Sequence, residues 1–330
     1  MKQPAAAHHL LSRIEELIGT ELLKVEMEFD RELSHDEPFV RDLLSHISRF
    51  RGKRLRPILV LLAAQAVGEI RSEHTALAAV SEMIHTATLV HDDILDEAEI
   101  RRHVATVNNR WNNETSVLLG DYLFTHAFHL AASLDTTLAC RLIGASTNRV
   151  CVGELQQIHE RGNLDLSEDQ YLSIIDGKTA ELCALCGELG AHYAGADETL
   201  SQAMREYGRS LGLAFQIADD LLDVMGDEAE TGKSLGSDLA KQKLTLPIIR
   251  LLESATPERR EQIQEWLQLG DSQSRRLLKE ELQSSSAVEQ AHQRAMEFAQ
   301  QARLSLSGLM ETPARRLLED LTEFAVQRTF

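Results

Sequence analysis

Apolar residues recur along most of the chain at the three- and four-residue spacing of amphipathic helices, and the alternating runs typical of strands are few. Residues 8–50 fit amphipathic helices with a polar break near "SHDEPF". Apolar helices are predicted at about 57–68, opened by Pro57, and at about 75–97. Aromatic residues make up only 5% of the chain, which also favours helices over sheets. We therefore predict an all-α fold.

The second half of the chain continues this pattern. We predict a helix N-cap at Ser167, a long helix over 200–226 and, after a polar loop that contains glycines, another helix from Pro247. Beyond residue 255 the sequence is charged and helical to its end. No low-complexity linker and no repeat of 20–50 residues interrupts it, so we expect a single domain over residues 1–330.

One predicted helix carries a narrow polar stripe on an otherwise apolar surface. When residues 77–96 are placed on a helix, four polar side chains share this stripe: His85, Thr88, Asp92 and Asp96. A helix that is apolar nearly all round is normally buried in a bundle. Buried polar groups need partners, so the stripe predicts a binding site.

Asp92 and Asp96 lie one helical turn apart and repel each other, and the nearby helix C-terminus adds an unfavourable dipole interaction. A divalent cation would remove this conflict. Mg²⁺ usually takes one or two protein carboxylates together with phosphate oxygens of a substrate. The alternative interpretation is a solvated acidic helix end, "DEAE".

A second acidic motif, "FQIADDLLD", repeats the arrangement 127 residues later with Asp219, Asp220 and Asp223. Asp219 and Asp223 share a helical face with Gly212 and Gln216, and the neighbouring positions are apolar. One DDxxD motif could arise by chance in an acidic chain, but two inside apolar helices are much less expected. We predict facing helices with carboxylates on either side of one cavity, as in metal-binding bundles.

The formal net charge is −18, which argues against a nucleic acid partner. An anionic ligand would therefore need local basic clusters or metal ions. Candidate basic side chains stand beside glycines or helix ends: Lys53, Arg54, Arg56, Arg101, Arg102, Lys178, Lys233 and Lys243. For any single one of them the alternative is a solvated surface charge.

The four cysteines do not form a recognisable metal-binding pattern. Cys183 and Cys186 have zinc-like spacing, but no second pair or histidine cluster accompanies them, so small buried thiols in a helix are the preferred interpretation. Low cysteine content suits a reducing cytosol, and we expect a cytoplasmic protein. The N-terminus has no long apolar segment, and no stretch approaches 18 apolar residues, so no membrane span is expected.

These motifs together resemble the trans-prenyl diphosphate synthases, particularly the longer-chain polyprenyl members. "GKRLRP", "IHTATLVHDDILDEAEIRR", "SVLLGDYLFTHAF", "GKTA", "FQIADDLLD" and "GKSLGSD…KLTLP" occur in the family's order, and the resemblance runs from about residue 10 to the C-terminus. It implies an isoprenoid synthase-type helical bundle around a central cavity, Mg²⁺ as cofactor and a homodimer.

The resemblance also implies a role for each candidate residue. Asp92 and Asp96 would bind Mg²⁺ on one side, with Asp93 in support. Asp219 would bind Mg²⁺ opposite, with Asp220 and Asp223 in support through direct or water contacts. The allylic diphosphate would be held by Arg101, Lys178 and Lys233, helped by Lys243. Isopentenyl diphosphate would be held by Lys53, Arg56, His85 and Arg102. The catalytic group would be Lys178 with Thr179 and Gln216, the last two turning oxygen dipoles toward the reacting carbons.

Several positions depart from the family pattern. Arg51 stands where a second glycine usually precedes "GK", and Gln242 stands where glycine is common before Lys243. "RRGxPT" reads "RRHVAT", with His103 for glycine and Ala105 for proline. These changes affect loop geometry and leave the charged groups in place.

The expected reaction is head-to-tail condensation of isopentenyl diphosphate with an allylic diphosphate, giving a medium- or long-chain all-trans polyprenyl diphosphate. The small residues Ala87 and Thr88 just before Asp92 leave the channel below the metal site open, and its floor is expected near Leu142 or Ile143. A short-chain farnesyl or geranylgeranyl diphosphate synthase is the alternative for product length.

Other functions are less well supported. A terpene cyclase is disfavoured by the second DDxxD motif and by "GKRLRP", and a non-catalytic partner subunit by the presence of all six aspartates. A metal phosphohydrolase, suggested by "HDD" at 91–93, would need further spaced histidines. For His85 the alternative to binding is a core or capping role.

Overall fold

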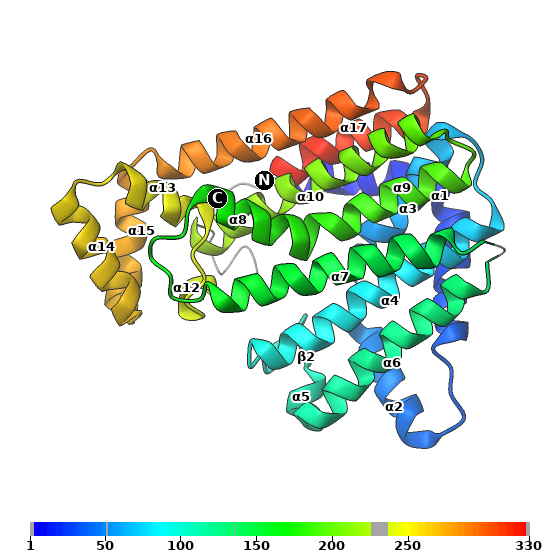
Figure 1. The fold of residues 1–330 in the computed structure, drawn as a ribbon, viewed down its shortest axis with the longest axis horizontal. Coiled ribbons are helices and arrows are strands. Elements are labelled where there is room, and N and C mark those ends of the chain that lie inside the picture. Colours follow the sequence, from blue (N-terminus) through cyan, green and yellow to red (C-terminus); the bar gives the residue numbers. More distant parts are fainter. Residues whose placement is uncertain (1–2, 51, 135, 226–236, 328–330) are drawn as a thin grey trace.

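The computed structural model describes residues 3–50, 52–134, 136–225 and 237–327. Its first half contains α1 (Gln3–Glu32), α2 (Pro38–Ile47), η1 (Ser48–Phe50), α3 (Leu55–Val67), α4 (Ser72–Leu95), α5 (Val107–Arg110), α6 (Asn113–Ala132) and α7 (Leu138–His159). Its second half contains α8 (Glu168–Ile175), η2 (Asp176–Ala180), α9 (Glu181–Tyr193), α10 (Glu198–Met225), α12 (Ser237–Ala240), α13 (Leu246–Ser254), α14 (Pro257–Leu269), α15 (Ser272–Ser284), α16 (Ala287–Ser305), η3 (Leu306–Gly308) and α17 (Pro313–Val326). Figure 1 shows the long helices side by side, with α13, α14 and α15 grouped at one end.

The all-α prediction is confirmed. Within the described ranges, the strands are the two-residue β1 (Ile100–Arg101) and β2 (Val104–Ala105), which pair as a small hairpin. The helices predicted at 57–68, 75–97 and 200–226 correspond to α3, α4 and α10. The predicted N-cap at Ser167 is confirmed too, as a reciprocal capping box with Gln170.

The core is built around α3, α4 and α9, which are buried along most of their lengths, and around the buried apolar face of the amphipathic α10. Helix α4 packs along α6, α3 along α9, and α10 between α9 and α16. Glycines let α9 and α10 approach closely. A Cβ atom at Gly212 would lie 2.6 Å from the Cα of Ala180, and one at Gly208 would collide with the carbonyl of Cys183. This close crossing brings the last turns of α10 against η2.

Two of the positions that depart from the family pattern adopt the left-handed backbone conformation. The hairpin turn between β1 and β2 consists of Arg102 (φ 50°) and His103 (φ 65°), and Gln242 has φ 56°. Glycine occupies such conformations at little cost, which explains why the family favours it there. His103 and Gln242 therefore stabilise these loops less than glycine would. Arg51 lies outside the described residues.

The cysteine prediction is confirmed, since Cys183 and Cys186 are buried free thiols in α9. Burial raises the pKa of the Cys186 thiol, which keeps it unreactive. Among the described helices, none combines the length and apolar character needed to cross a bilayer.

Candidate active site

The first acidic motif lies at the C-terminal end of α4. Apolar side chains bury this helix, while Asp92 and Asp96 stay half-buried at its end. Asp96 is the C-cap of the helix and forms ion pairs with two lysines, its Oδ1 lying 3.0 Å from Nζ of Lys243 and its Oδ2 3.1 Å from Nζ of Lys241. Burial alone would raise the pKa of Asp96, but these two lysines outweigh it, so its pKa lies below the usual value. Asp96 therefore remains ionised at neutral pH.

Asp93 is buried, unlike the half-buried Asp92 and Asp96. Its Oδ1 accepts hydrogen bonds from Arg101, with Oδ1 2.8 Å from Nε and 2.7 Å from an Nη atom. The Oδ2 atom of Asp93 is buried without a hydrogen-bond partner. Burial raises the pKa of Asp93 and the Arg101 guanidinium opposes that rise. Arg101 is thus held beside the first motif by Asp93.

Lys178 and Thr179 lie on η2, a single π-helical turn between α8 and α9. The sequence predicted a helix here but not its π geometry, a distortion that often marks functional sites. Asp176 at the start of the turn is held by Arg209 at 2.6 Å and Arg149 at 3.0 Å. These two ion pairs anchor the start of the turn to α10 and α7.

The Lys178 ammonium group points at the first motif. It donates a hydrogen bond of 2.7 Å to Oε1 of Gln157, forms an ion pair with Glu154 and lies 3.6 Å from Oδ2 of Asp92. Burial would lower the pKa of Lys178, but Asp92 and Glu154 outweigh it and raise that pKa. For Asp92, burial is the main effect and raises its pKa, with Lys178 acting against it. The pair is therefore a half-buried carboxylate with a nearby cation.

The second acidic motif lies near the end of α10. Asp219 and Asp223 are half-buried, whereas Asp220 is buried. The Thr179 hydroxyl donates to Oε1 of Gln216 at 2.9 Å, and the amide Nε2 of Gln216 donates to Oδ1 of Asp220 at 2.7 Å. These contacts join η2 to α10.

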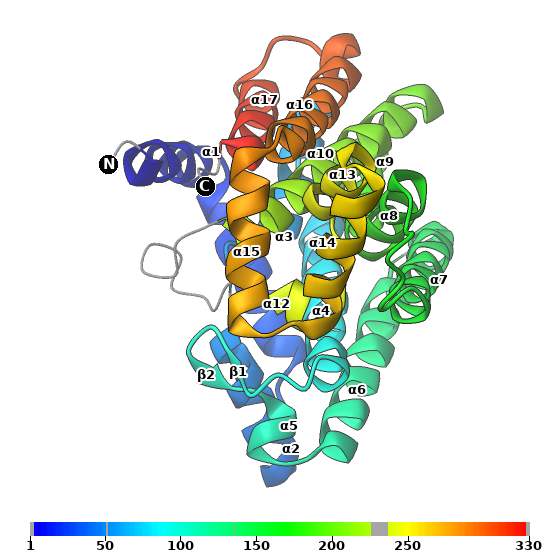
Figure 2. The same cartoon turned by 90° about the vertical axis from the view of Figure 1, so that its left-hand side faces the viewer.

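The ends of α4 and α10 are connected by two routes. Lys178 and Thr179, adjacent on η2, contact Asp92 and Gln216 respectively. The segment after α10 makes the other route, since the backbone N–H of Asp238 donates to Asp223 at 3.1 Å and Lys243 binds Asp96. In Figure 2, α12 accordingly lies beside the end of α4. The two acidic motifs thus belong to one connected site.

The donor atoms around this site are carboxylate oxygens, the ligands that Mg²⁺ and Ca²⁺ prefer. Within the described ranges, no three His, Cys, Asp or Glu side chains converge as a metal site made by protein alone would require. Half-buried carboxylates from two helices instead suit an ion whose remaining ligands are phosphate oxygens and water. The residues present therefore fit a divalent metal bound together with a diphosphate.

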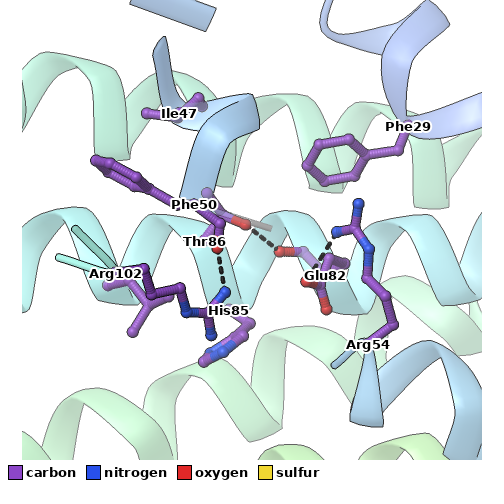
Figure 3. A pocket seen from close by; sticks show the side chains of 9 residues that line it. Phe29, Ile47, Phe50, Arg54, Glu82, His85, Thr86 and Arg102 are labelled. Carbon is purple, nitrogen blue, oxygen red and sulfur yellow. Dashed lines mark hydrogen bonds and ion pairs between the residues drawn. The ribbon is translucent and has the colours of Figure 1, made fainter. Parts of the chain in front are cut away.

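A cationic pocket lies beside α4, lined by Phe29, Ile47, Phe50, Arg54, Glu82, His85, Thr86, Leu89 and Arg102 (Figure 3). An Nη atom of Arg54 donates to Glu82 at 3.0 Å, and Arg102 donates to the carbonyl of Phe50. The other Nη atom of Arg54 and the Nε of Arg56 are buried without hydrogen-bond partners. Buried donors in excess of acceptors suit an anion.

His85 lines this pocket, and the neighbouring arginines affect its protonation. Burial, followed by the charges of Arg56 and Arg102, holds the pKa of His85 well below its usual value. The imidazole is therefore neutral near pH 7 and offers one donor to an anion. Lys53 is exposed at the neighbouring chain segment, with its ammonium 5.3 Å from the centre of the Phe324 ring.

The structure brings the candidate residues into two groups. The connected acidic site joins Asp92, Asp96, Lys178, Thr179, Gln216, Asp223 and Lys243, with Arg101 beside it on Asp93 and Asp219 next to Asp220 on α10. His85 and Arg102 line the cationic pocket, Arg56 acts on His85 through its charge, and Lys53 does not line the pocket. Lys233 lies outside the described residues. Neighbours that were not predicted include Glu82, Glu154, Gln157, Tyr171, Asp238 and Lys241. Only Glu82 had a usable signal, as a carboxylate on an apolar helix three residues before His85.

Comparisons with known proteins identify the family of the chain. Residues 37–284 match the family model described as polyprenyl synthetase. The chain is 36% identical over 321 residues to octaprenyl diphosphate synthase from Escherichia coli K12, covering 96% of this chain and 99% of the relative. A decaprenyl diphosphate synthase structure from Rhodobacter capsulatus superposes with a TM-score of 0.91 at 35% identity, covering 96% and 98% of the two chains. A polyprenyl synthase structure from Caulobacter crescentus CB15, complexed with calcium and isoprenyl diphosphate, gives 0.91 at 34% identity, with the same coverage.

The fold is an all-α bundle that carries paired aspartate motifs and basic side chains. Together with these relatives, it defines the class of the protein, the prenyltransferases with the isoprenoid synthase fold. The chain belongs to the polyprenyl synthetase family. The resemblance inferred from the motifs is thereby confirmed, as is the prediction of a prenyltransferase.

Proposed function

We propose that the protein condenses isopentenyl diphosphate with an allylic diphosphate and releases a medium- or long-chain all-trans polyprenyl diphosphate. The observation that carries this proposal is the connected acidic site, in which Lys178 and Thr179 join Asp92 on α4 to Gln216 on α10. Relatives named as octaprenyl and decaprenyl diphosphate synthases support the product class.

The half-buried carboxylates Asp92, Asp96, Asp219 and Asp223 would hold Mg²⁺, which neutralises the charge of the departing diphosphate. The Caulobacter relative was crystallised with calcium and isoprenyl diphosphate, which supports a divalent ion in this family. Lys178 lies beside Asp92, Lys243 binds Asp96 and Arg101 binds the neighbouring Asp93, and these three cations would hold the allylic diphosphate. Lys233, proposed for the same role, is outside the described residues.

The cationic pocket would bind isopentenyl diphosphate through His85 and Arg102, which line it, and through Arg56, whose charge acts on His85. Lys53 does not line the pocket, and its role toward the same ligand is proposed from the motif resemblance alone. The neutral imidazole of His85 would donate a hydrogen bond to the phosphate and take no proton from the reacting carbon. Thr179 and Gln216 would direct oxygen atoms at the allylic cation. The apolar interior of the bundle would keep water from that cation.

The test is incubation of the purified protein with labelled isopentenyl diphosphate, Mg²⁺ and each of several allylic primers, followed by sizing of the products. We expect linear polyprenyl diphosphates. Cyclic hydrocarbons formed without isopentenyl diphosphate would instead indicate a terpene cyclase, and no product with any primer would indicate a non-catalytic subunit. Either result would overturn the proposal.

Product length offers a direct test of where the chain grows. Ala87 is buried in α4, five residues before Asp92, and Ile143 on α7 is also buried while Leu142 is partly buried. Ala87→Phe is expected to shorten the product, because the ring would fill the space below the metal site. Chromatography of the labelled products measures this.

The control for this variant is Ala78→Phe, an equally buried position on α4 that lies further from the aspartates. Both changes overpack the core and are expected to cost about 1–3 kcal/mol of stability. Only Ala87→Phe should change product length. Products of unchanged length from Ala87→Phe would rule out growth of the chain along this part of α4.

We also propose a homodimer formed through the neighbouring helices α6 and α7. Five large apolar side chains of these two helices are exposed: Val117, Leu118, Val152, Leu155 and Ile158. They lie toward the start of α6 and the end of α7, two helices that pack against each other. We take these five side chains as the proposed apolar surface, since large apolar side chains left exposed on neighbouring helices are typical of an interface between subunits.

The variant Leu118→Glu/Leu155→Glu is expected to convert the dimer to a monomer, because it places charges in the centre of that apolar surface. Light scattering during size-exclusion chromatography measures the mass. Leu304→Glu, at an exposed apolar position on α16, serves as the matched control and should leave the mass unchanged. A wild-type protein that elutes as a monomer would refute the interface.

We also propose that residues 1–330 form a single domain and that the protein is cytoplasmic.

A further inference from the structure

Asp220 differs in its surroundings from Asp219 and Asp223, the two half-buried aspartates of the second motif. It is 4% exposed, and both of its carboxylate oxygens are engaged inside the protein. Oδ2 accepts a hydrogen bond of 2.6 Å from the hydroxyl of Tyr171, and Oδ1 accepts one of 2.7 Å from the amide of Gln216. Asp219 and Asp223, on the neighbouring positions of α10, are both less buried.

Tyr171 comes from α8 and is itself only 3% exposed. The capping box formed by Ser167 and Gln170 fixes the start of this short helix, and Ile174 and Ile175 bury its inner face. The tyrosine hydroxyl is therefore delivered to Asp220 by a rigid element. No sequence motif identified Tyr171, because its function depends on a partner 49 residues away.

Oδ1 of Asp220 accepts the hydrogen bond from Nε2 of Gln216, so the NH₂ end of the amide faces Asp220. Burial raises the pKa of Asp220, and a proton held on Oδ2, beside Tyr171, would leave this contact unchanged. The carbonyl end must then face Thr179, whose hydroxyl donates to it at 2.9 Å. The two ends of an amide have nearly the same shape, so their orientation is decided by the partners. The chain Tyr171–Asp220–Gln216–Thr179 thus selects one of two orientations of Gln216.

We propose that Tyr171 and Asp220 are positioning residues that keep the carbonyl oxygen of Gln216 directed to the reaction centre, and that Asp220 is not a metal ligand. This inference rests on the proposed function and refines the metal-binding role predicted for Asp220. Without the pair, Gln216 can rotate and present its NH₂ group, whose partial positive charge disfavours an allylic cation. The pair therefore acts on the chemical step and leaves diphosphate binding unchanged.

Two conservative variants test the proposal, Tyr171→Phe and Asp220→Asn. We expect kcat at saturating Mg²⁺ to fall about 10–100-fold in each, the loss typical of removing a partner that orients a residue of the site. KM for both diphosphates and the Mg²⁺ concentration for half-maximal activity should stay at wild-type values. Since both changes act through Gln216, the double variant should lose no more activity than Asp220→Asn alone.

Tyr207→Phe is the matched control. Tyr207 is a fully buried tyrosine on α10 whose hydroxyl donates to the carbonyl of Leu318 at 2.8 Å, outside this chain of hydrogen bonds. Tyr171→Phe and Tyr207→Phe should lower the melting temperature to a similar extent, but only Tyr171→Phe should lower kcat. Thermal unfolding and steady-state kinetics measure the two effects.

Three results would overturn the inference. The first is a kcat for Tyr171→Phe equal to that of Tyr207→Phe. The second is an Asp220→Asn variant whose activity is restored by raised Mg²⁺, which would identify Asp220 as a metal ligand. The third is an additive loss in the double variant. A wild-type protein that forms no prenyl product would refute the proposed function instead, so the two failures are distinguishable.

Discussion

Replacing Asp92 with asparagine is expected to lower kcat/KM by about 10³-fold and to raise the Mg²⁺ concentration needed for half-maximal activity. Asparagine keeps the shape of the side chain and removes its charge. Burial raises the pKa of Asp92, so an ionised carboxylate at this position is costly to maintain. Such a cost is understandable where the charge binds a cation. Steady-state kinetics at varied Mg²⁺ concentration measure both effects.

The control for this substitution is Asp36→Asn. Asp36 is exposed between α1 and α2, so the change removes the same charge from the chain without touching the bundle interior. Its activity and metal requirement should equal those of the wild type. An Asp92→Asn variant with the kinetics of Asp36→Asn would show that the first acidic motif does not bind the catalytic metal.

The helices could be predicted because their signals are local. Apolar spacing identified α3, α4 and α10, and the N-cap of α8 followed from Ser167, since both signals lie within a few residues of the element they define. The π-helical turn at Asp176–Ala180 could not be predicted in the same way. Its anchors are Arg149 and Arg209, each about 30 residues away, and no local pattern reveals such ion pairs.

The same distinction applies to the site. Both acidic motifs are visible in the sequence because their members are three or four residues apart on one helix. The partners that give each aspartate a different environment come from elsewhere: Arg101 for Asp93, Tyr171 for Asp220 and Lys243 for Asp96. Helical spacing placed Asp93 and Asp220 off the faces shared by the other aspartates, but it could not identify their partners. The structure separates the buried members from the half-buried ones, which are the ones available to a metal.

Lys178→Met is expected to lower kcat by about 10²–10³-fold, with a different metal dependence from Asp92→Asn. The Lys178 ammonium lies 3.6 Å from Asp92 and pairs with Glu154, so it is placed to hold the leaving diphosphate beside the metal. It also competes with Mg²⁺ for the charge of Asp92. Its removal should therefore leave the half-maximal Mg²⁺ concentration unchanged or lower, whereas Asp92→Asn should raise it.

Lys178→Arg and Lys24→Met complete this experiment. Arginine keeps the charge but not the compact ammonium, so Lys178→Arg should retain part of the activity. Lys24 is an exposed lysine on α1 that pairs with Glu21 at 2.8 Å, and its replacement should have no effect on kcat. If Lys178→Met and Lys24→Met have the same kcat, Lys178 merely neutralises Asp92 and Glu154 in the folded protein. If Lys178→Met instead needs more Mg²⁺, Lys178 assists metal binding, and its assignment to the diphosphate would be wrong.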